Sequence, residues 1–172
     1  MYRLYVAISL IFAMFMDSVI FARFSILGVV PDCVLAVVVC VGILLGATDA
    51  AFAGCIAGII IDVLFGKAVG VNALAYMLSG MIGGIFYKKY FADNIFIPVA
   101  TVAVCAFLKE NFMAVVTGFM GGSFNYFEML ATYIVPSALF TSVLCLPVHI
   151  YLKPRLLQSS KKRYDRTAGG VK

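Results

Sequence analysis

Long, nearly uninterrupted runs of apolar residues constrain the fold of this chain more than any other feature. Six runs can be marked, each close to the roughly 20 residues that an α-helix needs to cross the hydrocarbon core of a bilayer. They are Leu4–Ala22, Ile26–Gly46, Thr48–Gly66, Val69–Tyr87, Ile95–Gly118 and Met129–Leu152. Lipid offers the backbone no hydrogen-bond partners, so these runs should be helical there. We predict an all-α, polytopic integral membrane protein, a six-transmembrane-helix bundle over residues 1–152.

The composition argues against a soluble globular domain. Residues of the set AVILMFWYC make up 64% of the chain, charged residues make up 12%, and the mean hydropathy is +1.08. Soluble domains carry about 25% charged residues, and a soluble fold of this size could not bury so much apolar surface. Six spans leave no room for a nucleotide-binding or catalytic domain, and there is no Gly-rich phosphate loop. We expect no ATPase, no other enzyme activity and no cofactor.

The cysteines and the histidine do not indicate a metal site. The cysteines all lie in apolar runs and show no C-x-x-C spacing. They are Cys33, Cys40, Cys55, Cys105 and Cys145. His149 has no second ligand near it in the sequence, and no set of serine, histidine and acid suggests hydrolysis. We interpret the cysteines as small apolar residues in helix packing and predict no metal site.

Lysine and arginine predict the orientation, because cytoplasmic loops carry an excess of both. With both termini in the cytoplasm, that side receives Arg3, Lys88, Lys89 and the basic tail 153–172, and the outer side receives only Arg23 and Lys67. We therefore predict cytoplasmic termini. We interpret the tail as a topology anchor, and attraction to anionic lipid or to an acidic partner is the alternative.

Glycines recur four residues apart, in the pairs Gly42–Gly46, Gly54–Gly58, Gly66–Gly70, Gly80–Gly84 and Gly118–Gly122. Residues four apart share a helix face, so each pair opens a groove that another helix backbone can approach closely. Packing inside the bundle is one interpretation of these grooves. The other assigns one of them to a helix of a partner protein. That partner-helix groove would consist of Gly54, Gly58, Gly66 and Gly70, with Asp62 as a polar register point.

Five ionisable residues fall within the apolar runs: Asp17, Asp32, Asp62, Lys109 and Glu110. Charges are costly in hydrocarbon, so these side chains should face the bundle interior or a wet cavity and have partners. With the predicted topology, all five fall roughly 4–8 Å to the outer side of the membrane midplane. We predict one shared polar cluster in which Lys109 pairs with one of the acids. It is either an outward-opening pocket or docking site, or an ion-pair network that fixes which helices are neighbours.

One stretch carries a family resemblance. Residues 54–80 read GCIAGIIIDVLFGKAVGVNALAYMLSG: a Gly-rich helix with Asp62, a short Gly-containing turn, and the start of the next helix. This stretch, with Pro31-Asp32 ahead of an apolar run, resembles the rod shape-determining protein MreD family. Length, span number and the short basic tail agree with that family, whereas Lys109-Glu110-Asn111 is more charged than its pattern.

The resemblance implies a bacterial inner-membrane subunit of the cell-shape (elongation) machinery with no catalytic activity of its own. It implies association with the lipid bilayer and with the single-span protein MreC. Through MreC, the family associates with the MreB filament, RodA and a class B penicillin-binding protein. We expect no nucleic-acid partner. The charges in the outer half also suit an alternative, the substrate-capture membrane subunit of an energy-coupling-factor vitamin transporter, which has a similar size and span number.

Overall fold

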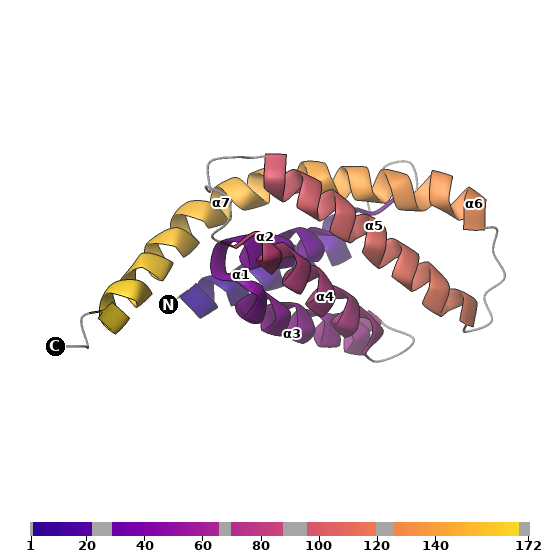
Figure 1. The fold of residues 1–172 in the computed structure, drawn as a ribbon. Helices are drawn as coiled ribbons and strands as arrows, with labels where there is room; N and C mark the ends of the chain where they lie inside the picture. The colour runs from indigo at the N-terminus through magenta and orange to yellow at the C-terminus, as the bar shows by residue number, and fades with distance from the viewer. Residues whose placement is uncertain (1, 22–28, 66–69, 88–95, 120–125, 169–172) are drawn as a thin grey trace.

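The protein is a bundle of helices in a computed structural model that describes residues 2–21, 29–65, 70–87, 96–119 and 126–168 (Figure 1). The elements are α1 (Tyr2–Phe15), η1 (Met16–Phe21), α2 (Cys33–Leu45), α3 (Ala47–Phe65), α4 (Val71–Ile85), α5 (Phe96–Phe119), α6 (Tyr126–Met129), η2 (Leu130–Ile134) and α7 (Val135–Ala168). Every one of these elements is a helix, which confirms the all-α prediction. Arg23, Gly66, Lys67, Lys88, Lys89, Gly122 and the end of the tail lie outside the described residues.

Three stretches of the described chain are long and apolar enough to cross a membrane: α3, α5, and Leu130–Leu156 in the last helical stretch. Two further helices, α2 and α4, are apolar but have only 13 and 15 residues. At 1.5 Å per residue they are about 20 and 22 Å long, less than the roughly 30 Å hydrocarbon core. These helices are consistent with a membrane protein.

The short helix α2 forms the centre of the bundle. All residues from Cys33 to Gly42 are buried, and α2 contacts α1, α3, α4, α5 and α7. A helix that is apolar on every side can be covered by other helices all round. The helix begins after Asp32 and ends at Gly46, whose positive φ of 110° stops the helical geometry.

Glycines bring α2, α3 and α4 together backbone to backbone. A Cβ added to Gly42 would lie 2.5 Å from the carbonyl oxygen of Gly80, and one added to Gly80 would lie 2.8 Å from that of Ala50. A Cβ on Gly84 would lie 2.3 Å from Cα of Ala47. Contacts this close exclude any side chain, so these glycines serve packing within the bundle.

The last helical stretch is longer than the predicted span, because α7 continues through Leu152 to Ala168. The π-helical η2 ends just before Pro136, which lacks the N–H that an α-helical turn would use there. Pro147 and Pro154 lie inside α7, which bends away from the bundle toward its C-terminal end (Figure 1). The first turn of α1 and the last turn of α7 lie on the same side of the bundle (Figure 1).

Candidate functional site

Asp32 caps the N-terminus of α2 and lies at the centre of a buried polar cluster. Its backbone is extended, with φ −110° and ψ 91°, and its Oδ1 accepts a hydrogen bond from the Leu35 N–H at 2.8 Å. This is the ordinary geometry of an N-cap aspartate. The Asp32 N–H donates to Oγ1 of Thr141 in α7 at 3.1 Å. The remaining carboxylate oxygen, Oδ2, is free to accept from other helices.

Two side chains from other helices meet at that oxygen. Nζ of Lys109, on α5, lies 2.6 Å from Asp32 Oδ2 and 3.2 Å from Oε1 of Glu110. The hydroxyl of Tyr76, on α4, donates to the same Oδ2 at 2.9 Å. Nζ of Lys109 also lies 5.2 Å from the centroid of the Tyr76 ring, close enough for a cation–π interaction. Asp32 and Glu110 are each only 8% exposed, so the ion pairs are buried.

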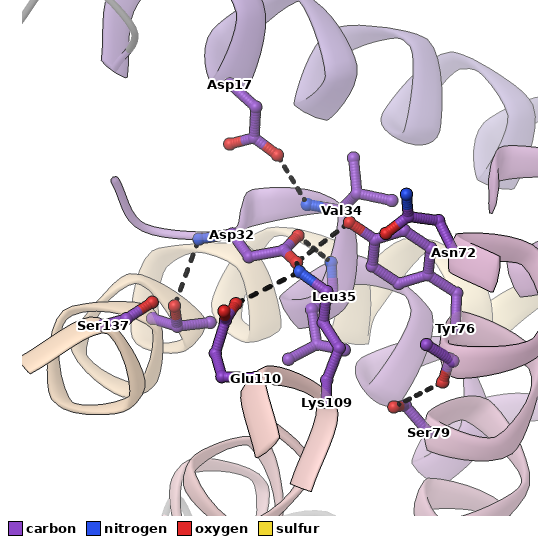
Figure 2. Close-up of polar contacts among 12 residues, drawn as sticks. Asp17, Asp32, Val34, Leu35, Asn72, Tyr76, Ser79, Lys109, Glu110 and Ser137 are labelled. Atoms are coloured by element: carbon purple, nitrogen blue, oxygen red, sulfur yellow. Dashed lines mark hydrogen bonds and ion pairs between the residues drawn. The ribbon is translucent and has the colours of Figure 1, made fainter. Parts of the chain in front are cut away.

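Asp17 reaches the same helix end from η1. Its Oδ1 accepts from the Cys33 N–H at 3.0 Å and its Oδ2 from the Val34 N–H at 3.1 Å. The first amides of a helix have no partner within the helix and carry partial positive charge, so a carboxylate is stable there. Figure 2 shows Asp17, Asp32, Lys109 and Glu110 around the start of α2. The structure thus brings together four of the five ionisable residues that we expected to meet.

The fifth residue, Asp62, forms a separate site. It is buried near the end of α3, where its Oδ2 accepts from the N–H groups of Gly70 and Ala73 at 2.8 and 3.2 Å. Its Oδ1 accepts from the backbone N–H and the side-chain Nδ2 of Asn72 at 3.2 and 2.8 Å. Asp62 therefore holds the first amides of α4. The expectation that all five ionisable residues share one cluster is therefore wrong for Asp62. Its carboxylate accepts hydrogen bonds from the first amides of α4, which have no acceptor within their own helix.

The groove at Gly54 and Gly58 is filled by the chain's own α4. A Cβ on Gly58 would lie 2.3 Å from Cα of Ala73, and one on Gly54 would lie 2.5 Å from the carbonyl oxygen of Tyr76. No partner helix fits at these two glycines, so packing within the bundle accounts for both of them. The physical reason is the short connection after Phe65, which places the next helix of the same chain in the groove. Gly70 has φ +102° before α4, and a Cβ there would meet nothing within 4 Å.

A cavity of about 340 Å³ lies beside the polar cluster. Its walls carry the charged side chains of Asp17, Asp32, Lys109 and Glu110 together with Tyr76 and Tyr133. Three residues around this cluster and cavity, Tyr76, Thr141 and Tyr133, were not expected from the sequence. The one signal that could have identified them is a polar atom within an apolar run. Uncharged polar residues are common in transmembrane helices, so this signal is weak.

A second hollow, of about 520 Å³, lies between α1 and α3 over part of α2. Its lining is mostly apolar and includes Leu10 and Ile11 from α1 and Phe52 and Ile56 from α3. Ala7 also lines it and is exposed. This hollow could not be expected from the sequence, because its existence depends on how far apart α1 and α3 lie.

A sequence model of one protein family, described as MreD, rod shape-determining protein MreD, matches residues 1–155. The match includes the four clustered charges, the Asp62 site and both hollows. It is the family that residues 54–80 resemble, so the resemblance is confirmed. No curated protein and no solved structure matches the chain.

Proposed function

This chain belongs to the MreD family of rod shape-determining proteins, and from that premise we propose that it is a non-catalytic scaffold of the bacterial elongation machinery. Its role in rod cell shape at the membrane follows from the family. As a scaffold it docks the single-span protein MreC and links MreB filaments to peptidoglycan synthesis by RodA and a class B penicillin-binding protein. The observation that carries this proposal is the family match over residues 1–155, which covers nearly the whole helical bundle.

The proposed scaffold crosses the inner membrane six times, with both termini in the cytoplasm. Two observations support this topology. The first turn of α1 and the last turn of α7 lie on the same side of the bundle, as an even number of crossings requires (Figure 1). The basic residues of the tail and of the stretch around Lys88 and Lys89 fall on that side when the spans alternate.

The docking face in this proposal is the hollow between α1 and α3, since α4 occupies the glycine groove. Its occupant is the single transmembrane helix of MreC. The hollow offers that helix apolar walls on α1 and α3, including Leu10 and Ile56. In a bilayer, association of helices depends on close van der Waals packing rather than on the hydrophobic effect, so an existing groove favours one neighbour over lipid.

The substitution Ala7→Trp tests this face, because it fills the hollow from an exposed position. We expect the variant to insert and fold normally and to lose co-purification with MreC. The matched control is Val104→Trp on α5, at a side chain that is 55% exposed and outside the hollow. Unchanged co-purification of the Ala7→Trp variant would exclude the hollow as the docking face. A deletion strain that keeps its rod shape would exclude the scaffold role itself.

One observation favours the alternative function, substrate capture for a vitamin transporter, and it is the polar cavity beside Asp32. Calorimetry of the purified protein with a panel of vitamins tests it. Tight binding together with a deletion strain of normal shape would replace the scaffold with the transporter subunit.

A further inference from the structure

Arg155 joins α7 to α1 through two tyrosine rings. Its Cζ lies 4.1 Å from the centroid of the Tyr151 ring, one turn earlier on α7, and 5.9 Å from the centroid of the Tyr5 ring on α1. Its Nη1 also donates a hydrogen bond to the hydroxyl of Tyr151. All three side chains are exposed. A guanidinium that rests on aromatic rings in this way is held in one orientation at the surface of the protein. We call these three residues the α1–α7 seam.

The guanidinium of the α1–α7 seam has donors to spare. Arginine carries five N–H donors in a planar fork, and the hydrogen bond described for Arg155 is the one to Tyr151. The chain around and after it is basic. From Lys153 to Arg166, α7 carries six basic residues and one acid, Asp165. Spare donors on a cation within a basic stretch favour an anionic ligand.

The seam lies at the level where the apolar part of the helices ends. Tyr5 lies near the start of α1, and the apolar part of the last helical stretch ends at Leu156. Beyond that residue α7 continues to Ala168 and bends away from the bundle (Figure 1). Tyrosine and arginine are typical of this level of a membrane protein, because the rings can contact acyl chains while the charge reaches the headgroups. Phosphates of the bilayer are therefore within reach of Arg155.

Exposed apolar side chains lie next to the seam on both of its helices. Ile8, three positions after Tyr5 on α1, is 53% exposed, and Ile150, beside Tyr151 on α7, is 60% exposed. A ligand held by Arg155 would thus meet a positive charge at one end and apolar side chains at the other. A phospholipid has this amphipathic form, whereas an acidic segment of a soluble protein has no use for the apolar contacts. The surroundings of Arg155 favour the lipid.

We propose that the α1–α7 seam binds the headgroup of an anionic phospholipid, with Arg155 as the donor to its phosphate and the two tyrosines as the rings that orient the guanidinium. A guanidinium can bind a phosphate through two parallel hydrogen bonds, which adds geometric specificity to the attraction of the charges. The basic continuation of α7 adds attraction to the same membrane surface. The site goes beyond the scaffold role and lies apart from its docking face, because Tyr5, Tyr151 and Arg155 are not part of the lining of the α1–α3 hollow.

The test uses the full chain in nanodiscs of phosphatidylcholine and phosphatidylglycerol in equal parts. After transfer to mild detergent, native mass spectrometry counts the lipids that each variant retains. We expect the wild type to retain phosphatidylglycerol in preference to phosphatidylcholine. Arg155→Gln should lower the affinity for phosphatidylglycerol at least about tenfold, since charge-assisted hydrogen bonds are lost. No preference in the wild type would overturn the proposal, and so would equal retention by Arg155→Gln, which would leave an acidic protein as the partner of this surface.

Two matched variants separate a specific site from general attraction between a basic tail and the membrane. Lys172→Gln removes the same charge at the end of the chain and should retain lipid like the wild type. Arg155→Lys keeps the charge but loses the planar fork and the stacking on the rings, so it should bind phosphatidylglycerol more weakly than the wild type. Equal losses in Arg155→Gln and Lys172→Gln, or an Arg155→Lys variant that binds like the wild type, would reduce the effect to net charge and overturn the proposal.

A fluorescence experiment keeps the proposal testable if the Arg155→Gln variant fails to fold. The chain has no tryptophan, so Tyr151→Trp places a single reporter beside Arg155 and keeps an aromatic ring under the guanidinium. We expect brominated phosphatidylglycerol to quench this reporter more strongly than brominated phosphatidylcholine at the same mole fraction. The control is Phe119→Trp, at an exposed residue at the end of α5, where the two lipids should quench equally. The same quenching ratio at both positions would overturn the proposal.

Discussion

Nζ of Lys109 lies 2.6 Å from Oδ2 of Asp32, a residue 77 positions earlier in the chain. This ion pair joins the middle of α5 to the first turn of α2. Tyr76 from α4 donates to the same carboxylate oxygen, and Thr141 from α7 accepts from the Asp32 backbone. One residue therefore connects the central helix to three of its neighbours, and its contacts specify which helices lie side by side.

Removing the cation should destabilise the bundle strongly. In Lys109→Met, the buried carboxylates of Asp32 and Glu110 lose their counter-ion, which costs about 3–5 kcal/mol in comparable buried pairs. Adding Asp32→Asn should recover part of this loss, because asparagine still caps a helix. The free energy of unfolding in mixed detergent micelles measures both effects. A Lys109→Met variant as stable as the wild type would show that the pair is not structural.

Asp62 should stabilise the α3–α4 hairpin and have no part in the cavity. Asp62→Ala removes the acceptor for three backbone amides and the Asn72 side chain, so we expect a loss of about 2–3 kcal/mol. Asn72→Ala loses only one of these hydrogen bonds and should cost about 1 kcal/mol. An Asp62→Ala variant as stable as the wild type would show that this carboxylate does not hold the start of α4.

A side chain at Gly58 should separate α3 from α4. In Gly58→Leu the new Cβ would meet Cα of Ala73 at 2.3 Å, so we expect a loss of about 3 kcal/mol or more and a low yield of folded protein. Ile59→Leu, on the exposed side of the same helix, is the control and should be neutral. Size-exclusion chromatography and thermal melting measure the outcome. A stable Gly58→Leu variant that loses only its co-purification with MreC would instead support the interpretation of this groove as a site for a partner helix.

The packing of α2 against α7 predicts a specific cross-link. The Sγ atoms of Cys40 and Cys145 lie 3.6 Å apart in the buried core. Oxidation by copper phenanthroline, with oxygen as electron acceptor, should remove two protons and two electrons and join the two sulfurs. Mass spectrometry after thiol alkylation detects the product. Cys145→Ala should abolish it, and a wild type that forms no such bond would contradict the packing.

The proposed topology predicts where reporters are active. Green fluorescent protein fused after Lys172 should fluoresce, because it folds in the cytoplasm. Alkaline phosphatase fused after Gly122, between α5 and α6, should be active, because that connection faces outward in a six-span arrangement. Active phosphatase at the C-terminus would reverse the orientation, and activity at both positions would change the number of spans.

Some of the site could be foreseen from residue types alone. The charges at Asp17, Asp32, Lys109 and Glu110 lie in apolar runs, and the cost of burying them made contact with one another the natural expectation. Their predicted depths along the helices placed all four side chains near one level of the membrane. The same reasoning failed for Asp62, because depth does not reveal that the first amides of α4 lie within reach of its carboxylate.

Local properties of the chain were therefore sufficient to predict the helices, the membrane environment and the family. They also predicted that each buried charge needs a partner. These follow from the hydropathy of neighbouring residues and from the cost of burying a charge. The identity of each partner came from the fold. Protein interior and lipid are equally apolar, so hydropathy cannot distinguish a glycine groove that receives α4 from one that receives another protein. That choice depends on which backbone comes closest, and only the packed arrangement of the helices determines it.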